Sequence, residues 1–125
     1  MAKPSSSRSP ARRSPVQRLR DICLALPEAA EKETWGDLTW RVRDKIFAMQ
    51  RQDDGRLAVW FKAPPGSQSI LVGADPDRFF SPPYVGPKGW IGMRVDRKPD
   101  WNEADTLIRR SYRLVAPKKL GALLD

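Results

Sequence analysis

The sequence predicts an α+β domain in which helices cover one face of an antiparallel β-sheet. Three observations lead to this prediction. The length of 125 residues is typical of one domain. Apolar residues recur at helical spacing near both ends of the chain, and strand-like alternation with turn signals lies between them. The other face of such a sheet would meet solvent or a partner.

The beginning of the chain differs in composition from the rest. Residues 1–14 are rich in Ser, Pro and basic residues and contain no large apolar residue after Met1. Such a segment buries too little apolar surface to offset the entropy lost on ordering. We therefore expect a disordered basic tail at residues 1–14, serving as a solubility segment or as an arm that binds nucleic acid. A single domain is expected at residues 15–125.

Both long helices have recognisable start signals. Ser14 followed by a proline predicts the first helix, because a hydroxyl caps free N–H groups and proline fits the first turn. Cys23 lies on its apolar stripe, which favours a core residue over a reactive thiol, and Pro27 ends the helix. Asp100 and Glu103 resemble a capping box at the last long helix. Other helical segments are expected at 67–74, capped by Ser67, at 77–80 as one turn, and at 118–124.

Alternating apolar and polar residues predict an antiparallel meander in the middle of the chain. Asp53-Asp54-Gly55 is a strong hairpin signal, because these residue types tolerate the turn conformations that join two strands. The strands are expected at residues 33–35, 38–42, 46–51 and 56–62 and, after a Pro- and Gly-rich loop, at 90–95.

The residue inventory excludes several kinds of site. The chain has no His and one Cys, so a His-assisted nucleophile, an intramolecular disulfide and a thiolate zinc site are all excluded. No apolar run is long enough to span a membrane, and the N-terminus lacks the apolar segment of a secretory signal. Glu33 and Asp37 are more typical of a solvated patch than of an acid–base pair. We expect a cytoplasmic protein that is not an enzyme, uses no cofactor or metal and enters no membrane.

The charge balance favours an anionic partner. The formal net charge is +8, and the 19 bases and 15 acids after residue 14 leave +4 on the expected domain. Strand alternation directs aliphatic residues toward the helices and places a basic, aromatic set on the opposite face. Such a face suits nucleic acid, although a solvated face with Trp packed on Arg stems would have the same composition. The set comprises Arg41, Arg43, Arg56, Trp60, Lys62, Trp90 and Arg94.

The segment at residues 79–92 is unusually rich in Pro, Gly and aromatic residues. Three glycines and Lys88 would present backbone N–H groups to a phosphate, although the spacing matches neither a Walker loop nor a dinucleotide fingerprint. A rigid loop that leads into the next strand is favoured over this phosphate site. A third interpretation is a small-anion site lined by Tyr84, Lys88 and Trp90.

Two sequence blocks carry a family resemblance. PPYVGPKGW at residues 82–90 and SYRLVAPKKL at residues 111–120, with Trp35-Gly36 and Asp100-Trp101, resemble the MmcQ/YjbR family. The resemblance covers residues 16–124 and implies a fold similar to that of CyaY and frataxin, a two-layer α/β sandwich with an antiparallel sheet. It also implies DNA binding through a double-wing arrangement, with no defined catalytic or base-reading residues to carry over.

A frataxin-like fold also raises the question of iron binding. Frataxin-type iron sites use an acidic ridge on the first helix and the adjoining strand, whereas the first helix here has Arg18, Arg20 and a single acid, Asp21. The charge pattern argues against an iron chaperone, and fold alone does not support one. We therefore expect a DNA-binding monomer of low sequence specificity. The alternative is a protein-interaction module on the same sheet face, because Trp and Arg are favoured interface anchors.

Overall fold

The protein folds as a six-stranded antiparallel sheet with its two longest helices on one face. The computed structural model describes residues 13–53 and 55–124, so the expected tail lies outside the described residues except for Arg13 and Ser14. In chain order the elements are α1 (Pro15–Leu24), β1 (Ala30–Thr34), β2 (Asp37–Val42), β3 (Lys45–Asp53), β4 (Arg56–Phe61), α2 (Ser67–Ala74), β5 (Phe79–Phe80), η2 (Gly86–Lys88), β6 (Ile91–Arg94), α3 (Trp101–Val115) and α4 (Lys118–Ala122).

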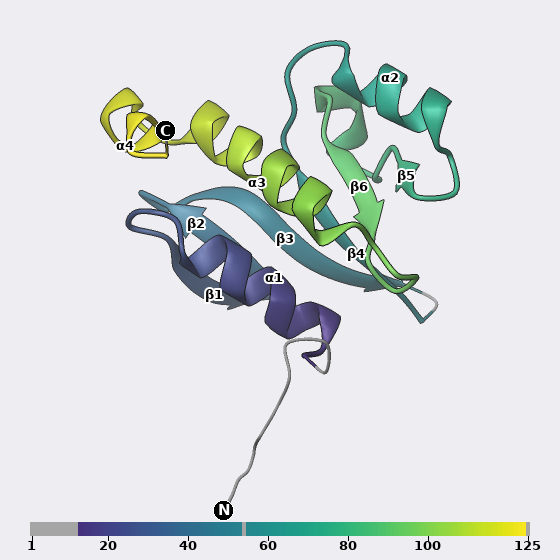
Figure 1. Ribbon diagram of the computed structural model, residues 1–125, viewed down its shortest axis with the longest axis horizontal. Coiled ribbons are helices and arrows are strands. Elements are labelled where there is room, and N and C mark those ends of the chain that lie inside the picture. Colours follow the sequence, from purple (N-terminus) through teal and green to yellow (C-terminus); the bar gives the residue numbers. More distant parts are fainter. Residues whose placement is uncertain (1–12, 54, 125) are drawn as a thin grey trace, which may run out of the picture.

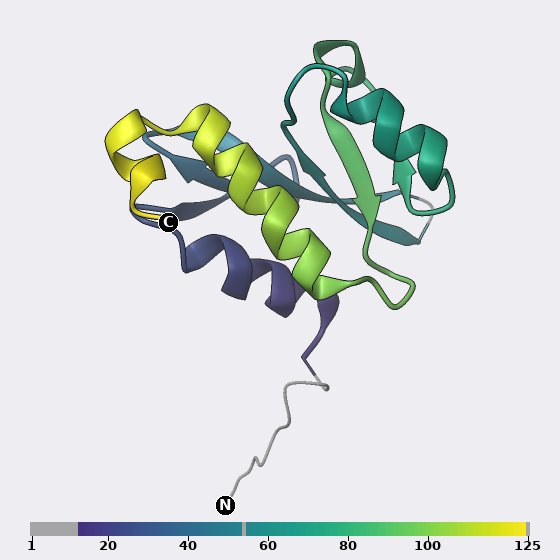
Figure 2. The same cartoon turned by 45° about the horizontal axis from the view of Figure 1, so that its top comes forward.

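The strands lie in the order β1-β2-β3-β4-β6-β5, and each neighbouring pair is antiparallel. Helices α1 and α3 lie in front of the sheet in Figure 1, and α2 lies beside β5 and β6 at the end of the sheet far from β1 (Figure 2). This arrangement confirms the predicted α+β class.

The starts of the helices follow from local sequence. Ser14 Oγ accepts a hydrogen bond from Gln17 N (3.2 Å), and Gln17 Oε1 accepts one from Ser14 N (3.0 Å), which completes a capping box. At α3 the Asp100 carboxylate accepts bonds from two N–H groups of the first turn. The capping box predicted there is not completed, because the Glu103 carboxylate accepts a 2.6 Å bond from Arg78 instead.

Several element boundaries differ from the sequence prediction. The first strand lies earlier than expected, because Trp35 adopts φ +52 in the turn that follows β1. Gly66 and not Ser67 is the N-cap of α2; its φ of +88 is a conformation that glycine adopts without strain. Residues 79–80 form β5 instead of a helical turn, since Phe79 pairs with Met93 across the sheet.

One apolar core lies between the sheet and the helices. The aliphatic side of β4 faces this core, as alternation predicts, through Leu57, Val59 and Phe61. Ser111 of α3 is fully buried, and its hydroxyl donates to the Phe47 carbonyl (2.6 Å) and accepts from Lys62 N (2.9 Å). Because these bonds hold α3 against β3 and β4, the opposite side of these strands faces away from α1 and α3.

Candidate functional site

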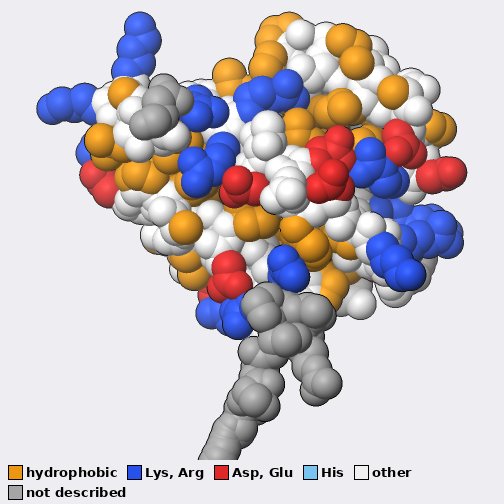
Figure 3. Space-filling view, viewed as in Figure 1, with side chains coloured by type: hydrophobic (Ala, Val, Ile, Leu, Met, Phe, Trp, Pro, Cys, Tyr) orange, Lys and Arg blue, Asp and Glu red, His pale blue; other side chains and the backbone are white. Residues whose placement is uncertain are grey.

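The two sides of the sheet differ in how their charges are arranged. On the helix-covered side, acidic and basic side chains are interspersed with apolar ones over α3 and its surroundings (Figure 3). The other side, called here the open face, is best followed through strand pairing, because directly paired residues point to the same side of a sheet.

Two rows of paired residues cross the open face. One row pairs Met49 with Trp60 and Trp60 with Gly92, which in turn pairs with Phe80. The neighbouring row pairs Arg51 with Ala58 and Ala58 with Arg94. The strand register therefore places basic residues directly beside a row that contains two large aromatic residues, Trp60 and Phe80.

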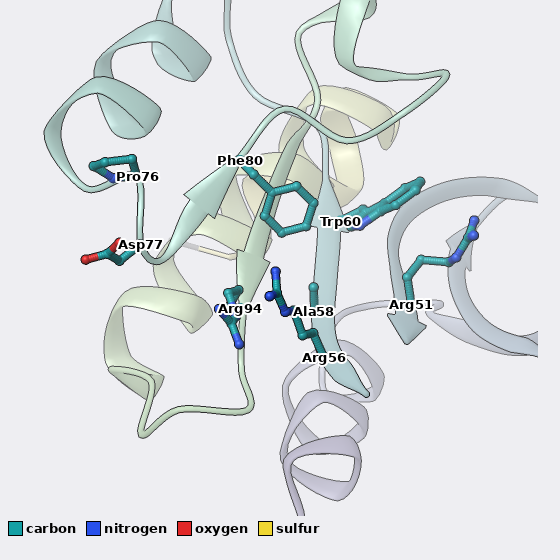
Figure 4. A pocket seen from close by; sticks show the side chains of 8 residues that line it. All are labelled: Arg51, Arg56, Ala58, Trp60, Pro76, Asp77, Phe80 and Arg94. Carbon is teal, nitrogen blue, oxygen red and sulfur yellow. The ribbon is translucent and has the colours of Figure 1, made fainter. Parts of the chain in front are cut away.

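A pocket of about 380 Å³ opens over these rows (Figure 4). Two small residues leave the space that this pocket occupies. Ala58 lies between Arg51 and Arg94 in the basic row. Gly92 leaves room for the ring of Phe80 in the neighbouring row, because a Cβ at this position would overlap that ring. The pocket is lined by Arg51, Arg56, Ala58, Trp60, Pro76, Asp77, Phe80 and Arg94.

The three arginines of the pocket differ in their partners. Arg51 Nε lies 3.1 Å from Asp37 Oδ2, and its guanidinium carbon lies 4.6 Å from the ring centroid of Trp60. Arg94 donates from Nε and Nη2 to Asp96 at 3.1 and 2.8 Å. Arg56 is exposed and has no hydrogen bond or ion pair with a described side chain.

The Arg94–Asp96 pair also shifts the ionisation of both groups. The hydrogen bond from Arg94 lowers the pKa of the Asp96 carboxyl, and the same bond raises the pKa of the guanidinium. Both groups are therefore charged throughout the neutral range. The two hydrogen bonds of this pair use Nε and Nη2 of Arg94, so the two N–H groups of Nη1 take no part in them.

The aromatic residues of the pocket have different roles. Trp60 is 2% exposed and Arg51 covers one face of its indole, so it forms the base of the pocket and not an open stacking surface. Its Nε1 is buried and has no hydrogen-bond partner among the described residues. Phe80 is partly exposed, and Figure 4 shows its ring next to Trp60, with the guanidinium of Arg56 below the ring.

The structure brings three of the eight predicted binding residues together in this pocket: Arg56, Trp60 and Arg94. Arg41 shares the open face but lies on β2, where it binds Thr39 Oγ1 (3.2 Å) and Thr34 Oγ1 (3.1 Å). Arg43 lies in the β2–β3 turn and forms a two-bond ion pair with Glu28 at 2.6 and 3.2 Å. Its position outside a strand separates it from the face that alternation predicts.

The remaining three predicted residues lie outside the pocket lining. Lys62 follows the end of β4, Lys88 is exposed in η2, and Trp90 precedes β6 with its carbonyl accepting a 2.6 Å bond from Gln68. The N–H groups of Val85, Gly86, Lys88, Gly89 and Trp90 all donate to carbonyls within this loop. These internal bonds favour the rigid-loop interpretation over a phosphate-binding loop.

Sequence reasoning missed Arg51, Asp77 and Phe80 as pocket residues. The side of the sheet on which Arg51 lies could have been predicted. The hairpin after Asp53 sets a register that pairs Arg51 with Ala58, and paired residues point to the same side. Phe80 had no such signal, because it reaches the pocket only through β5, a two-residue strand, and Asp77 lies in the turn just before this strand.

Over the described ranges, no helix has the length and apolar character that crossing a bilayer requires. Within the same part of the chain, no three His, Cys, Asp or Glu residues are grouped as metal ligands.

Comparison with known proteins then places the chain. Its fold is similar to the crystal structure of Deinococcus radiodurans protein DR2400, described by the family-model domain DUF419, with a TM-score of 0.73 and 23% identity over 89% of this chain and 90% of that chain. No curated protein matches the sequence. The YjbR family model matches residues 24–114. The chain therefore belongs to the YjbR family, as its sequence blocks predict.

Proposed function

We propose that this protein is a cytoplasmic, non-enzymatic nucleic-acid-binding protein of low sequence specificity that binds through its open sheet face. The observation that carries the proposal is the pocket in which Arg56, which has no ion pair with a described side chain, lies beside the partly exposed ring of Phe80 (Figure 4). A guanidinium neutralises a phosphate, and an aromatic ring stacks on a base of any sequence. These two groups provide affinity without reading base edges, which explains why we propose low specificity.

The non-enzymatic part of the proposal is supported by the chemistry of the described residues. The pocket lining includes one carboxylate, Asp77, and no second group that would act with it as an acid–base pair. Cys23 is fully buried, and burial raises the pKa of its thiol, so the nucleophilic thiolate is not formed at neutral pH. A buried free thiol also suits a reducing compartment.

Fluorescence anisotropy of a labelled DNA oligomer, titrated from low to physiological salt, tests this function. Arg56→Ala should weaken binding and lower the slope of log K against log salt by about one unit. Lys119→Ala is the matched control, because it removes one exposed positive charge from α4, outside the pocket. An unchanged slope for Arg56→Ala, or an equal effect of both variants, would contradict a role for the open face.

The second candidate function is a protein-interaction module on the open face. It is favoured by the pairing of Arg51 with Asp37 and of Arg94 with Asp96, which compensates most of the positive charge there. An indole- and arginine-centred protein interface needs no steep salt dependence, whereas nucleic-acid binding does. The same titration therefore separates the two candidates.

A further inference from the structure

The shape of the pocket restricts which form of nucleic acid it fits. Its volume of about 380 Å³ is at the low end of the range for sites that enclose a small ligand, roughly 300–1,000 Å³. A hollow of this size accepts one nucleotide, whereas the backbone of a duplex would contact only its edge. The pocket also has an aromatic ring beneath its opening, and paired, stacked bases of a duplex cannot reach such a ring.

The positions of the charged groups match the two ends of a nucleotide. Arg56 and Arg94 are diagonal neighbours across β4 and β6, since Arg94 pairs with Ala58. Diagonal neighbours lie roughly 7–8 Å apart in a sheet, so two arginine side chains can share one phosphate. Figure 4 shows the guanidinium of Arg56 next to the Phe80 ring and Arg94 next to Arg56, with Asp77 farther out at the rim.

The single carboxylate has a consequence for the ligand. Asp77 repels a second phosphate but accepts hydrogen bonds from the exocyclic amino groups of a base. The lining therefore combines cations for one phosphate, a ring for one base and an acceptor at the rim. This combination differs from the continuous cationic stripe that a duplex backbone requires.

Building on the proposed function, we propose that the pocket binds one unpaired nucleotide, with its phosphate at Arg56 and Arg94 and its base on Phe80. The protein consequently prefers single-stranded over double-stranded nucleic acid. The base stacks on the side of the Phe80 ring that faces away from Gly92, because Gly92 lies directly against the other side.

The first test compares a labelled 20-nucleotide single strand with the duplex of the same sequence. This length exceeds the roughly 4–16 nucleotides that single-strand binding sites cover. The full chain should bind the single strand at least about tenfold more tightly, the effect expected of one base stacked on a ring. Unlabelled AMP should compete, and ribose 5-phosphate, which has the phosphate but no base, should compete much less. Equal affinity for both strands, or equal competition by both small molecules, would overturn the proposal.

The second test uses Phe80→Leu, which should weaken single-strand binding roughly tenfold and leave duplex binding unchanged. Trp35→Leu is the matched control, because Trp35 is an aromatic residue with 92% exposure outside the pocket. If Arg56→Ala weakens both DNA forms while Phe80→Leu affects neither, the nucleotide pocket is wrong and the proposed function stands. If neither DNA form binds the full chain, both are wrong. The strand comparison and the competition use the unchanged chain, so they decide the question even if Phe80→Leu does not fold.

Discussion

Gly92→Ala is the substitution that most directly tests how the pocket is built. β6 lies between β4 and β5, so the backbone at Gly92 is paired on both sides and cannot move away. A Cβ here would overlap the far end of the Phe80 ring. Because Phe80 is a partly exposed residue on an edge strand, we expect its ring to swing toward solvent while the sheet stays intact.

The expected loss of stability follows from two opposing terms. Burying a Phe side chain fully stabilises a protein by about 1.5–3 kcal/mol, and the partly exposed Phe80 falls near the lower value. Replacing Gly by Ala within a strand recovers roughly 0.5–1 kcal/mol of conformational entropy. The free energy of unfolding of Gly92→Ala should therefore fall by about 1 kcal/mol in urea denaturation.

A double-mutant cycle makes this reasoning refutable. In a Phe80→Ala background the overlap is gone, so Gly92→Ala should raise the free energy of unfolding by roughly 0.5–1 kcal/mol instead of lowering it. Gly73→Ala in α2 is a control, because a Cβ there meets nothing within 4 Å. If Gly92→Ala has the same sign in both backgrounds, the contact between Gly92 and Phe80 does not shape the pocket.

Three further outcomes are expected. Ser111→Ala should lower the free energy of unfolding by roughly 2–3 kcal/mol, because it leaves a buried N–H and a buried carbonyl without their partner, whereas Thr106→Ala on the exposed side of α3 should have little effect in the same urea titration. Asp96 has a lower pKa in the folded than in the unfolded state, so its ionised form stabilises the fold above the unfolded pKa, near 3.8, and this stabilisation is lost as pH falls through the folded pKa. Acid unfolding should therefore be less steep in Asp96→Asn. An identical acid profile would contradict the ion pair with Arg94. Arg43→Ala should leave DNA affinity unchanged, since Arg43 is paired with Glu28 in a turn; anisotropy showing a loss equal to that of Arg56→Ala would move the interface toward that turn.

The fold was predictable because its signals are local. Ser14 and Asp100 mark helix starts through their own capping bonds, and the turn after Asp53 sets the pairing of β3 with β4. The two-residue β5 was not predictable, because only its pairing with β6 makes it a strand. A strand this short has no periodicity of its own.

The candidate site was partly predictable for the same reason. Alternation along β4 and β6 gave the correct side for Arg56, Trp60 and Arg94, which are within or at the ends of regular strands. Alternation gave no information about the side-chain contacts of these residues, and such contacts decide whether a side chain is free to bind a ligand. Arg43 is paired with Glu28, and Trp60 is covered by Arg51. The exposed ring of the pocket is instead Phe80, which long-range pairing brings to the face.

The compensated charges of the open face also limit how binding can depend on salt. Arg51 and Arg94 are paired with aspartates, so Arg56 is the pocket arginine without an ion pair to a described side chain. A single-stranded ligand releases counterions in proportion to the phosphates neutralised, about 0.7 in the salt slope for each. Under the proposed function, one phosphate held in the pocket therefore accounts for a slope of roughly 0.7, and stacking on Phe80 would supply much of the affinity at physiological salt. A much steeper slope for the full chain would place further phosphate contacts outside the pocket. The four basic residues among residues 1–14 would be the first candidates for such contacts.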